Sequence, residues 1–368
     1  MPDQDDYATT NKDSGREFPA PELPYRPRDP RAYRPKIGMI GCGGISESHL
    51  SNYHRVGYDV AALCDLIAAR ARKRQAQFYP EASVTMDYRD ILARPDIAVV
   101  DIATHPEDRA PIIEAALLAG KHVLSQKPFV IDLEAGEKLI RLAEEQGVKL
   151  AVNQNGRWAP NFSYMREAVR AGLVGDVMSV HASVHWDHTW IAGTPFEEVE
   201  DVILYDFGIH WFDFLNTVLR GRDITRVQAS RSRAAGQTAR PAMLAQVIVE
   251  FEGGQASLVF DGHIKYGMRA ETYVGGTSGA LHSAGPDIGI QTVTLDTADG
   301  RAAPGLHGEW FKDGFHGSMA ELLCAIEEDR EPMNGARDNM RSLQICFAAL
   351  AAARDGQPRR PGEVRKLS

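Results

Sequence analysis

The sequence predicts an α/β fold in two parts: an N-terminal doubly wound parallel sheet, and a C-terminal α+β domain with an open, largely antiparallel sheet. Between residues 36 and 155, short apolar runs alternate with helix-like segments, as in parallel sheets with right-handed crossovers. A glycine-rich turn directly follows the first apolar run. After residue 155, strand-like alternation with short glycine-bearing turns takes over, which is typical of antiparallel sheets.

The composition fits a soluble globular chain with about two domains. Its 368 residues are 43% hydrophobic and 25% charged, and the formal net charge is −9. This charge argues against nucleic acid or an anionic membrane as a partner, and no apolar run approaches the ~18 residues of a membrane span. The chain starts without the features of a secretory signal, and its four cysteines show no short paired spacing. We therefore expect a cytoplasmic protein with reduced thiols.

Residues 1–35 are polar at first and then rich in proline, so they cannot form a regular ladder of backbone hydrogen bonds. Two interpretations stay open. The segment is either a disordered leader or an extended arm that lies on its own subunit or on a neighbouring one. In the second case the anchors would be its large apolar side chains, Phe18, Leu23, Tyr25 and Tyr33.

The first strand, predicted at 37–41, leads into a glycine turn and then a helix at 45–56. Gly41 permits a tight turn because it has no Cβ. Gly43 would let a pyrophosphate approach the backbone, and Ser46 is small enough for close packing of helix on strand. The N-terminus of the helix attracts an anion. Although such turns also occur without a ligand, this one predicts a dinucleotide site at Gly41, Cys42, Gly43, Gly44, Ile45 and Ser46.

The second strand, at 59–64, ends at Asp65. Dinucleotide-binding units place an acid there, about 20 residues after the turn, to accept hydrogen bonds from the adenosine ribose. The carboxylate would repel a 2′-phosphate, so we expect NAD rather than NADP. The next helix carries basic residues that either grip a 2′-phosphate or form a solvated face: Arg70, Arg72, Lys73 and Arg74.

These signals predict that residues 36–155 form a Rossmann dinucleotide-binding domain. Its other strands are expected at 98–103, 121–125 and 149–153, and its other helices at 66–78, 87–93, 108–119 and 133–146. Ligands of such a sheet bind beyond the carboxyl ends of the strands. Further cofactor contacts are therefore expected from Thr104, His105, Gln126, Lys127 and Asn155.

Residues 156–368 are predicted to form the second domain, which binds the substrate and contacts other subunits. A helix is expected at 164–171, strands at 176–186, 225–232, 242–252, 255–263, 267–275 and 289–296, and closing helices at 313–329 and 337–354. One face of the strands within 242–263 mixes apolar and polar side chains, which suits a subunit interface. We expect a homodimer or homotetramer.

The segment 204–219 is nearly all apolar but carries Asp206, His210 and Asp213 at i, i+4 and i+7, one face of a predicted helix. A carboxylate beside an imidazole orients it and favours its protonated form, which suits a general acid–base group. The alternative is a capping aspartate with a structural histidine. Zinc binding is a third interpretation, but the pattern suggests no third ligand, so we expect no metal.

In its motifs the chain resembles the Gfo/Idh/MocA oxidoreductase family, which comprises NAD(P)-dependent sugar and cyclitol dehydrogenases. The resemblance covers about residues 36–355 and rests on Gly41, Gly43, Asp65, Lys127, Pro128, Arg157, and the intact Asp-x-Gly-x-His motif that ends at His210. Two positions depart from the family. Gln126 replaces the glutamate of its Glu-Lys-Pro triplet, and Arg109 replaces the histidine of its Thr-Pro-Asn-x-x-His motif.

The resemblance implies hydride transfer from a substrate C–H to the nicotinamide. His210 would take the hydroxyl proton, Asp206 would orient the imidazole or bind a neighbouring hydroxyl, and Lys127 would stabilise charge on the reacting oxygen. The substrate would be a sugar or polyol: an aldose, with a pentose such as apiose as one candidate, or a cyclitol. Its contacts would come from Lys127, Asn153, Arg157, Trp158, Asp187, His188, Asp206 and His210.

Two other functions stay open. A lyase or glycosidase could use bound NAD transiently without net oxidation. A non-catalytic NAD-binding regulatory protein would keep the glycine turn and Asp65 but would not need Lys127 and His210. Both of these residues are present, which favours the dehydrogenase.

Overall fold

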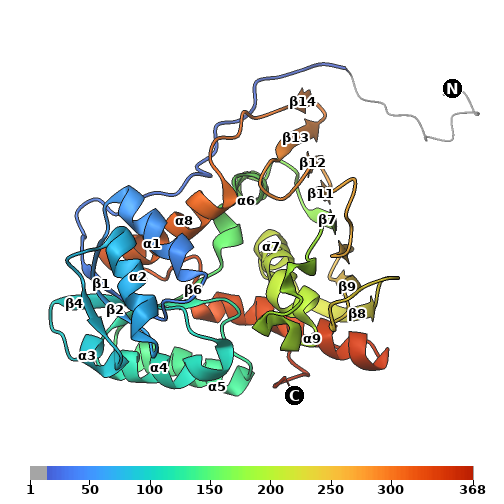
Figure 1. Cartoon of the computed structure of the whole chain (residues 1–368). Helices are drawn as coiled ribbons and strands as arrows, with labels where there is room; N and C mark the ends of the chain where they lie inside the picture. The colour runs from blue at the N-terminus through green and yellow to red at the C-terminus, as the bar shows by residue number, and fades with distance from the viewer. Residues whose placement is uncertain (1–14, 368) are drawn as a thin grey trace, which may run out of the picture.

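The computed structural model describes residues 15–367 and confirms the predicted fold class. It contains a six-stranded parallel sheet and an eight-stranded, largely antiparallel sheet. In Figure 1 the first sheet and its helices occupy the left of the view and the second sheet occupies the right. None of the helices within residues 15–367 has the length and hydrophobicity that a bilayer crossing requires.

The first sheet has the strand order β3-β2-β1-β4-β5-β6, and every pair is parallel. The order reverses between β1 and β4, which opens a crevice at the carboxyl ends of these strands. Its strands are β1 (Lys36–Ile40), β2 (Asp59–Cys64), β3 (Ser83–Thr85), β4 (Ile97–Ile102), β5 (His122–Gln126) and β6 (Leu150–Asn153). β3 is not among the predicted strands, because three residues carry almost no periodicity.

Helices cover this sheet on both faces (Figure 1). They are α1 (Ser46–Val56), α2 (Ala68–Phe78), α3 (Tyr88–Leu92), α4 (Pro106–Leu118) and α5 (Leu133–Glu145), and each starts close to its predicted range. From the C-terminal half of the chain, α8 (Trp310–Glu327) comes back to pack on α1. Helices from both halves of the chain therefore pack against the first sheet as one layer, with a common hydrophobic core.

The second sheet has the order β14-β13-β12-β11-β7-β10-β9-β8, in which β7 and β10 are parallel and the other pairs antiparallel. Its strands are β7 (Val177–His185), β8 (Ile224–Ser232), β9 (Leu244–Phe251), β10 (Gly254–Asp261), β11 (Arg269–Gly276), β12 (Gly279–Gly285), β13 (Thr292–Thr297) and β14 (Gly300–Ala302). β12 and β14 were not predicted, because both are rich in glycine and alanine, which have low strand propensity.

The two faces of this sheet differ. α7 (Ile209–Leu219) packs on β7, and α9 (Ala336–Asp355) packs on β8, while α6 (Pro160–Arg170) lies beside α7. On the other face, alternate side chains of β9 and β10 stay at least partly exposed: Leu244, Gln246, Ile248, Glu250, Ser257, Val259 and Asp261.

The predicted helix through Asp206, His210 and Asp213 is not continuous, and this expectation is wrong. Ile203–Phe207 forms one π-helical turn, and α7 begins only at Ile209. At Gly208 a Cβ would lie 2.8 Å from the Leu204 carbonyl oxygen, so the wide turn requires glycine there. Across this π-turn the Asp206 carboxylate bonds to Lys127 from the first half of the chain, and not to His210.

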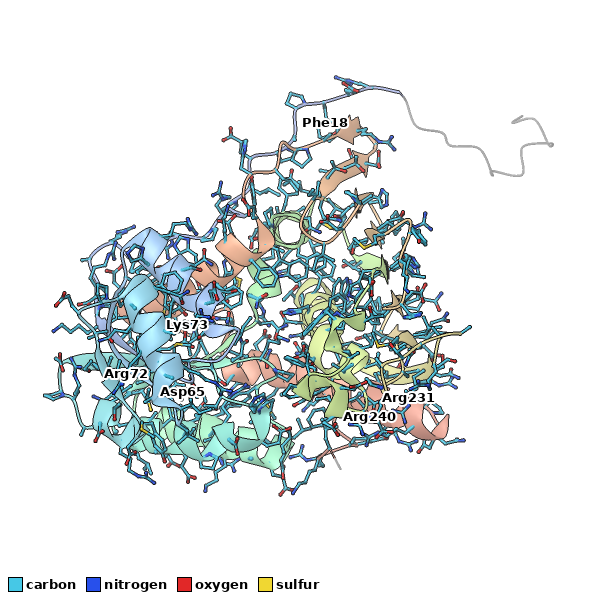
Figure 2. All side chains as sticks on the ribbon, viewed as in Figure 1. Phe18, Asp65, Arg72, Lys73, Arg231 and Arg240 are labelled. Atoms are coloured by element: carbon cyan, nitrogen blue, oxygen red, sulfur yellow. The ribbon has the colours of Figure 1, made fainter. Side chains whose placement is uncertain are left out.

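Residues 15–35 lie on their own chain. Phe18 is placed beside β14, where its N–H donates to the Arg301 carbonyl oxygen at 3.0 Å (Figure 2). Further along, the Glu327 carboxylate at the end of α8 accepts the backbone N–H groups of Arg31, Ala32 and Tyr33. The segment thus connects the edge of the second sheet to the first, and its four predicted anchors pack on the hydrophobic core: Phe18, Leu23, Tyr25 and Tyr33.

Candidate active site

The glycine turn after β1 has the shape that a bound pyrophosphate needs. Gly41 has φ +95°, and a Cβ there would lie 2.8 Å from the backbone of Ala103, so only glycine fits. Above Gly43 and Gly44 an added Cβ would meet no atom within 4 Å, so the backbone faces open space. The Ser46 hydroxyl donates to the Gly43 carbonyl oxygen at 2.6 Å, which holds the turn at the start of α1.

Asp65 follows β2, as predicted, and its carboxylate braces the turn. One oxygen accepts the Cys42 N–H and the other the Ile67 N–H, both at 2.8 Å. Figure 2 shows Asp65 at this strand end, with Arg72 and Lys73 on α2. Arg70, like these two residues, is exposed.

Arg74 departs from the interpretation of α2 as a solvated basic face. Its guanidinium is buried and donates to the Ser46 hydroxyl and to the carbonyl oxygens of Gly43 and Gly44. It also forms an ion pair with Glu47 at 2.6 Å. Arg74 therefore supports the glycine turn from beneath, and its hydrogen bonds leave it little capacity to grip a 2′-phosphate.

The ends of β4 and β5 carry the next group of predicted residues. Gln126 accepts the Lys127 N–H at its Oε1 atom, at 2.6 Å, and the Lys127–Pro128 peptide bond is cis. His105 is exposed at the start of α4. Among the described residues, the buried Thr104 hydroxyl has no hydrogen-bond partner, which leaves a polar atom that a cofactor in the crevice would satisfy.

Arg109 ties these two strand ends together. Its buried guanidinium donates to the backbone carbonyl oxygens of Thr104, Gln126 and Pro128. Burial lowers the pKa of Arg109 to about 10, which still leaves it charged near neutral pH. The residue that departs from the family motif therefore clamps the loop that presents Lys127.

Lys127 and Asp206 meet where the two halves of the chain join. Lys127 Nζ lies 2.8 Å from both the carboxylate and the carbonyl oxygen of Asp206. The side chains remain 14% and 29% exposed, respectively, so solvent reaches the pair. Burial raises the pKa of Asp206, but the charge and hydrogen bond of Lys127 outweigh it, and the net pKa is lowered. Asp206 is therefore an anion that holds the lysine in place.

His210 lies close by, but its environment differs from the predicted one. Burial above all, and then the Lys127 charge, lower its pKa to about 3, so the expected protonated imidazole is wrong. Gln154 Nε2 also donates to the Ile209 carbonyl oxygen, at 3.4 Å, and approaches His210 Nδ1 at 3.3 Å. This pattern makes Nδ1 an acceptor and assigns the ring proton to Nε2. His210 is thus a neutral hydrogen-bond donor.

His188 and its aromatic neighbours form another wall of the site. Its Nδ1 accepts the indole N–H groups of Trp186 and Trp190 at 3.0 and 3.3 Å, which leaves the proton on Nε2. Burial lowers the pKa of His188 to about 4, against an opposing effect of Asp206. Trp186 stacks on Phe207 with ring centroids 4.1 Å apart.

Several predicted substrate contacts lie elsewhere or are engaged in the fold. Asp187 is exposed and accepts the Thr189 N–H. Arg157 is buried in ion pairs with Asp213 and Asp338, so its predicted contact with a sugar is wrong. Trp158 is buried against α8, where a Cβ at Gly317 would meet its ring, and it is not available as a sugar platform.

The two predicted asparagines are also buried. Asn155 Oδ1 accepts the Trp310 indole N–H at 2.8 Å, and the ring of Trp310 lies edge-on to His210, with centroids 5.4 Å apart. Asn153 Nδ2 lies 3.1 Å from His49 Nε2. Asn155 thus supports the site through Trp310, rather than facing the crevice.

Sequence reasoning missed two supporting groups. Gln154 contacts His210, and its Oε1 accepts from Asn339 Nδ2 at 3.3 Å. The second is a buried network in which His49 Nε2 lies 3.0 Å from Gln126 Nε2 and His49 Nδ1 lies 2.6 Å from the Asp101 carboxylate. The sequence does carry a sign of this network: Asp101 is a charged residue inside an otherwise apolar strand, and buried polar groups need hydrogen-bond partners.

This arrangement suits redox chemistry on an alcohol. The glycine turn and Asp65 can hold a dinucleotide, and Lys127, His210 and His188 can surround an oxygen atom in front of the crevice. Within residues 15–367, no group of three His, Cys, Asp or Glu side chains is placed to hold a metal ion. The fold and site define an NAD-dependent oxidoreductase that acts on a CH–OH group.

Comparison with family models agrees. One model, an oxidoreductase family with an NAD-binding Rossmann fold, matches residues 35–154, and the GFO/IDH/MocA C-terminal domain matches residues 162–282. The chain therefore belongs to the Gfo/Idh/MocA oxidoreductase family, and its cofactor is NAD. The family, the activity class and the cofactor predicted from the sequence are confirmed.

Several individual relatives are named as dehydrogenases of a particular sugar or cyclitol. The chain is 27% identical to D-apiose dehydrogenase of Paraburkholderia graminis over 339 residues, which cover 88% of each chain. It is 24% identical to inositol 2-dehydrogenase of Rhizobium meliloti, over 86% of this chain and 96% of that one. An oxidoreductase from Agrobacterium radiobacter, solved with NAD+, L-tartaric acid and magnesium, shares the fold with a TM-score of 0.80 at 20% identity, over 90% of this chain and 99% of that one. These named relatives include sugar and cyclitol dehydrogenases.

Proposed function

We propose that the chain oxidises one hydroxyl of an aldose, a pentose such as apiose among them, or of a cyclitol. The observation that carries this proposal is the accessible Lys127–Asp206 ion pair, which lies beside two neutral histidines at the carboxyl ends of the first sheet. The names of the relatives support a polyhydroxylated substrate. NAD supplies the hydride acceptor when it is bound.

We assign the proton of the reacting hydroxyl to Lys127. In this scheme the Lys127 ammonium first releases a proton to solvent, which reaches the ion pair. The amine Nζ then accepts the hydroxyl proton, and the ammonium so re-formed is stabilised by Asp206 at 2.8 Å. A second cation on His210 would lie close to that ammonium, and the same repulsion already lowers the pKa of His210. This assignment replaces the predicted role of His210 as base.

His210 and His188 act as donors in this scheme. Each has its Nδ1 occupied by an N–H donor, so each presents Nε2–H. Two donors beside Lys127 can bind neighbouring oxygens of a polyol and stabilise charge that develops on the reacting oxygen. The stacked Trp186 and Phe207 add an apolar wall, which suits the C–H face of a sugar.

The test is to mix purified protein with NAD and a panel of aldoses and cyclitols that includes D-apiose and myo-inositol, and to record NADH absorbance. Accumulation of NADH with at least one substrate supports the proposal. Product formation without NADH would instead indicate transient use of NAD, and no turnover would indicate a regulatory protein. With a lysine base, His210→Gln should retain measurable NADH formation, whereas Lys127→Ala should lose it.

Cofactor preference depends on Asp65. Its carboxylate lies at the end of β2 and is held by two backbone N–H groups, so a 2′-phosphate would meet a fixed negative charge. We expect a higher kcat/KM with NAD than with NADP, and a smaller ratio in Asp65→Ala, measured by steady-state kinetics with both cofactors. An equal preference in the unmutated protein would contradict this assignment.

The exposed face of β9 and β10 is our candidate for the subunit interface. On this face Ile248 is 48% exposed among polar neighbours. A flat sheet face of mixed polarity suits a subunit interface. We propose a homodimer or homotetramer through this face and expect Ile248→Lys to lower the molar mass measured by light scattering. Glu134→Lys on α5 is the control. A monomeric mass for the unmutated protein would refute the proposal.

A further inference from the structure

A cavity lies outside the proposed catalytic crevice, at the C-terminal end of α7. Its volume is about 830 Å³, within the range of sites that bind small organic molecules. Its walls come from residues 24–28, from α6, from the C-terminal end of α7, from the segment 330–333 and from the start of α9. Lys127, Asp206 and His188 do not line it, so this cavity is separate from the proposed substrate site.

The lining of this cavity is strongly basic. Eight arginines and four carboxylates line it, although the whole chain has a formal net charge of −9. Six of these arginines are in ion pairs, among them Arg166 with Glu167 and Arg330 with Glu321. Burial lowers the pKa of Arg166, Glu167 opposes this effect, and the charges of Arg157 and Arg170 add a smaller lowering.

Two of the arginines that line the cavity keep their charge available. Within residues 15–367, no ion pair involves Arg220 or Arg341. The Arg341 guanidinium reaches the turn after α7, where it donates to the Arg222 carbonyl oxygen at 3.3 Å, and a Cβ at Gly221 would lie 3.4 Å from it. The two residues therefore lie at the same turn.

The backbone at Arg220 adds an independent observation. Arg220 has φ +51°, in the left-handed region, where a side chain with a Cβ costs energy and glycine is the usual residue. Arg220 is the C-cap residue of α7, so the turn would accept glycine at least as well and does not itself require an arginine side chain.

We propose that this cavity binds a small organic anion with at least two phosphate or carboxylate groups. Guanidinium groups bind both groups through paired hydrogen bonds. A single phosphate would leave most of the volume empty. The lining arginines come from separate segments, Arg220 and Arg341 at the turn after α7 and Arg26 in residues 24–28, so they can bind two separated groups. Arg26 is 52% exposed, and its nearest carboxylate, on Asp313, lies 3.6 Å away.

The test is calorimetric titration of the NAD-saturated protein with fructose 1,6-bisphosphate and, separately, with citrate. Saturation with NAD blocks the glycine turn, so phosphate groups cannot bind there. We expect one molecule bound per chain, and the tighter of the two probes identifies the anionic group. The double variant Arg220→Gly/Arg341→Ala should weaken binding by about tenfold or more, because charge-assisted hydrogen bonds are lost.

Arg141→Ala, on the exposed face of α5, is the matched control and should bind as the unmutated protein does. Glycine tolerates the backbone conformation at position 220, so the double variant should keep its melting temperature and its NAD affinity. Absence of binding by both probes would overturn the proposal, and so would equal binding by the double variant. The readout is binding, so it is independent of whether the chain oxidises a sugar.

Discussion

Two ion pairs flank the start of α7, and their surroundings differ. In the first, Lys127 and Asp206 are 2.8 Å apart with side chains 14% and 29% exposed. In the second, Arg157 and Asp213 are 2.6 Å apart with side chains 1% and 2% exposed. A lysine can exchange a proton, whereas a guanidinium stays charged. Solvent access and the type of cation together support our proposal that the first pair takes part in chemistry and that the second stabilises the fold.

Removal of the accessible cation should have the largest effect. Lys127→Ala removes the proton acceptor in our scheme, and general acid–base groups contribute ~10²–10⁴-fold in rate. We expect kcat to fall by at least about 10²-fold, with NAD affinity, measured by fluorescence titration, changed little. Lys138→Ala, a surface residue paired with Glu114, is the control and should keep its kcat. A loss of only a few-fold in Lys127→Ala would place the proton acceptor elsewhere.

Replacement of the buried cation, Arg157, should lower the stability of the protein rather than its turnover. Arg157→Met leaves Asp213 as an unpaired buried charge, and breaking a buried pair in this way costs ~3–5 kcal/mol. Asp206→Asn keeps an oxygen acceptor for Lys127 in a pair that solvent reaches, so it should lower the free energy of unfolding by less than Arg157→Met does. Denaturant unfolding of both variants measures the contrast. If the two variants lost the same stability, the distinction between the pairs would be wrong.

The smallest of the three effects should be a loss of stability in acid, caused by the two neutral histidines of the candidate site. His210 and His188 have pKa values lowered to about 3 and about 4. These imidazoles are therefore protonated at a lower pH in the folded chain than in the unfolded chain, where they titrate at about 6.5. Stability should therefore be unaffected by these groups above pH ~6.5 and fall as pH drops below it. We expect melting temperatures to decline between pH ~6.5 and ~4, and to decline less in His210→Gln. An identical decline in the variant would show that His210 is not held neutral.

Periodicity was sufficient for most elements and failed where it was short or interrupted. The strands and helices of the first sheet lie close to their predicted ranges, because buried strands and amphipathic helices repeat over many residues. β3, β12 and β14 have too few apolar positions to stand out. The π-turn before α7 was also hidden, since an apolar segment with Asp206 and His210 four residues apart reads as one helix.

The candidate site, too, was predictable from the sequence only in part. The glycine turn and Asp65 are recognisable in the sequence because they belong to one local strand–turn–helix unit. The partners of the polar residues are not, because they come from distant segments: Asp206 bonds to Lys127, 79 positions earlier, and Arg157 to Asp338, 181 positions later. Pairing Asp206 with His210 was the nearest local choice, whereas the carboxylate bonds to Lys127. The other predicted role of Asp206, binding a neighbouring hydroxyl, stays a prediction.

The sequence by itself determined the doubly wound sheet, the dinucleotide site and the family, since each depends on residue types at fixed short spacings. Only the tertiary structure decided which charges are sealed and which are reached by solvent, and that His210 is neutral. The physical reason is that the pKa and the role of a charged group depend on burial and on the charges around it, and these surroundings exist only after the two halves of the chain have packed together.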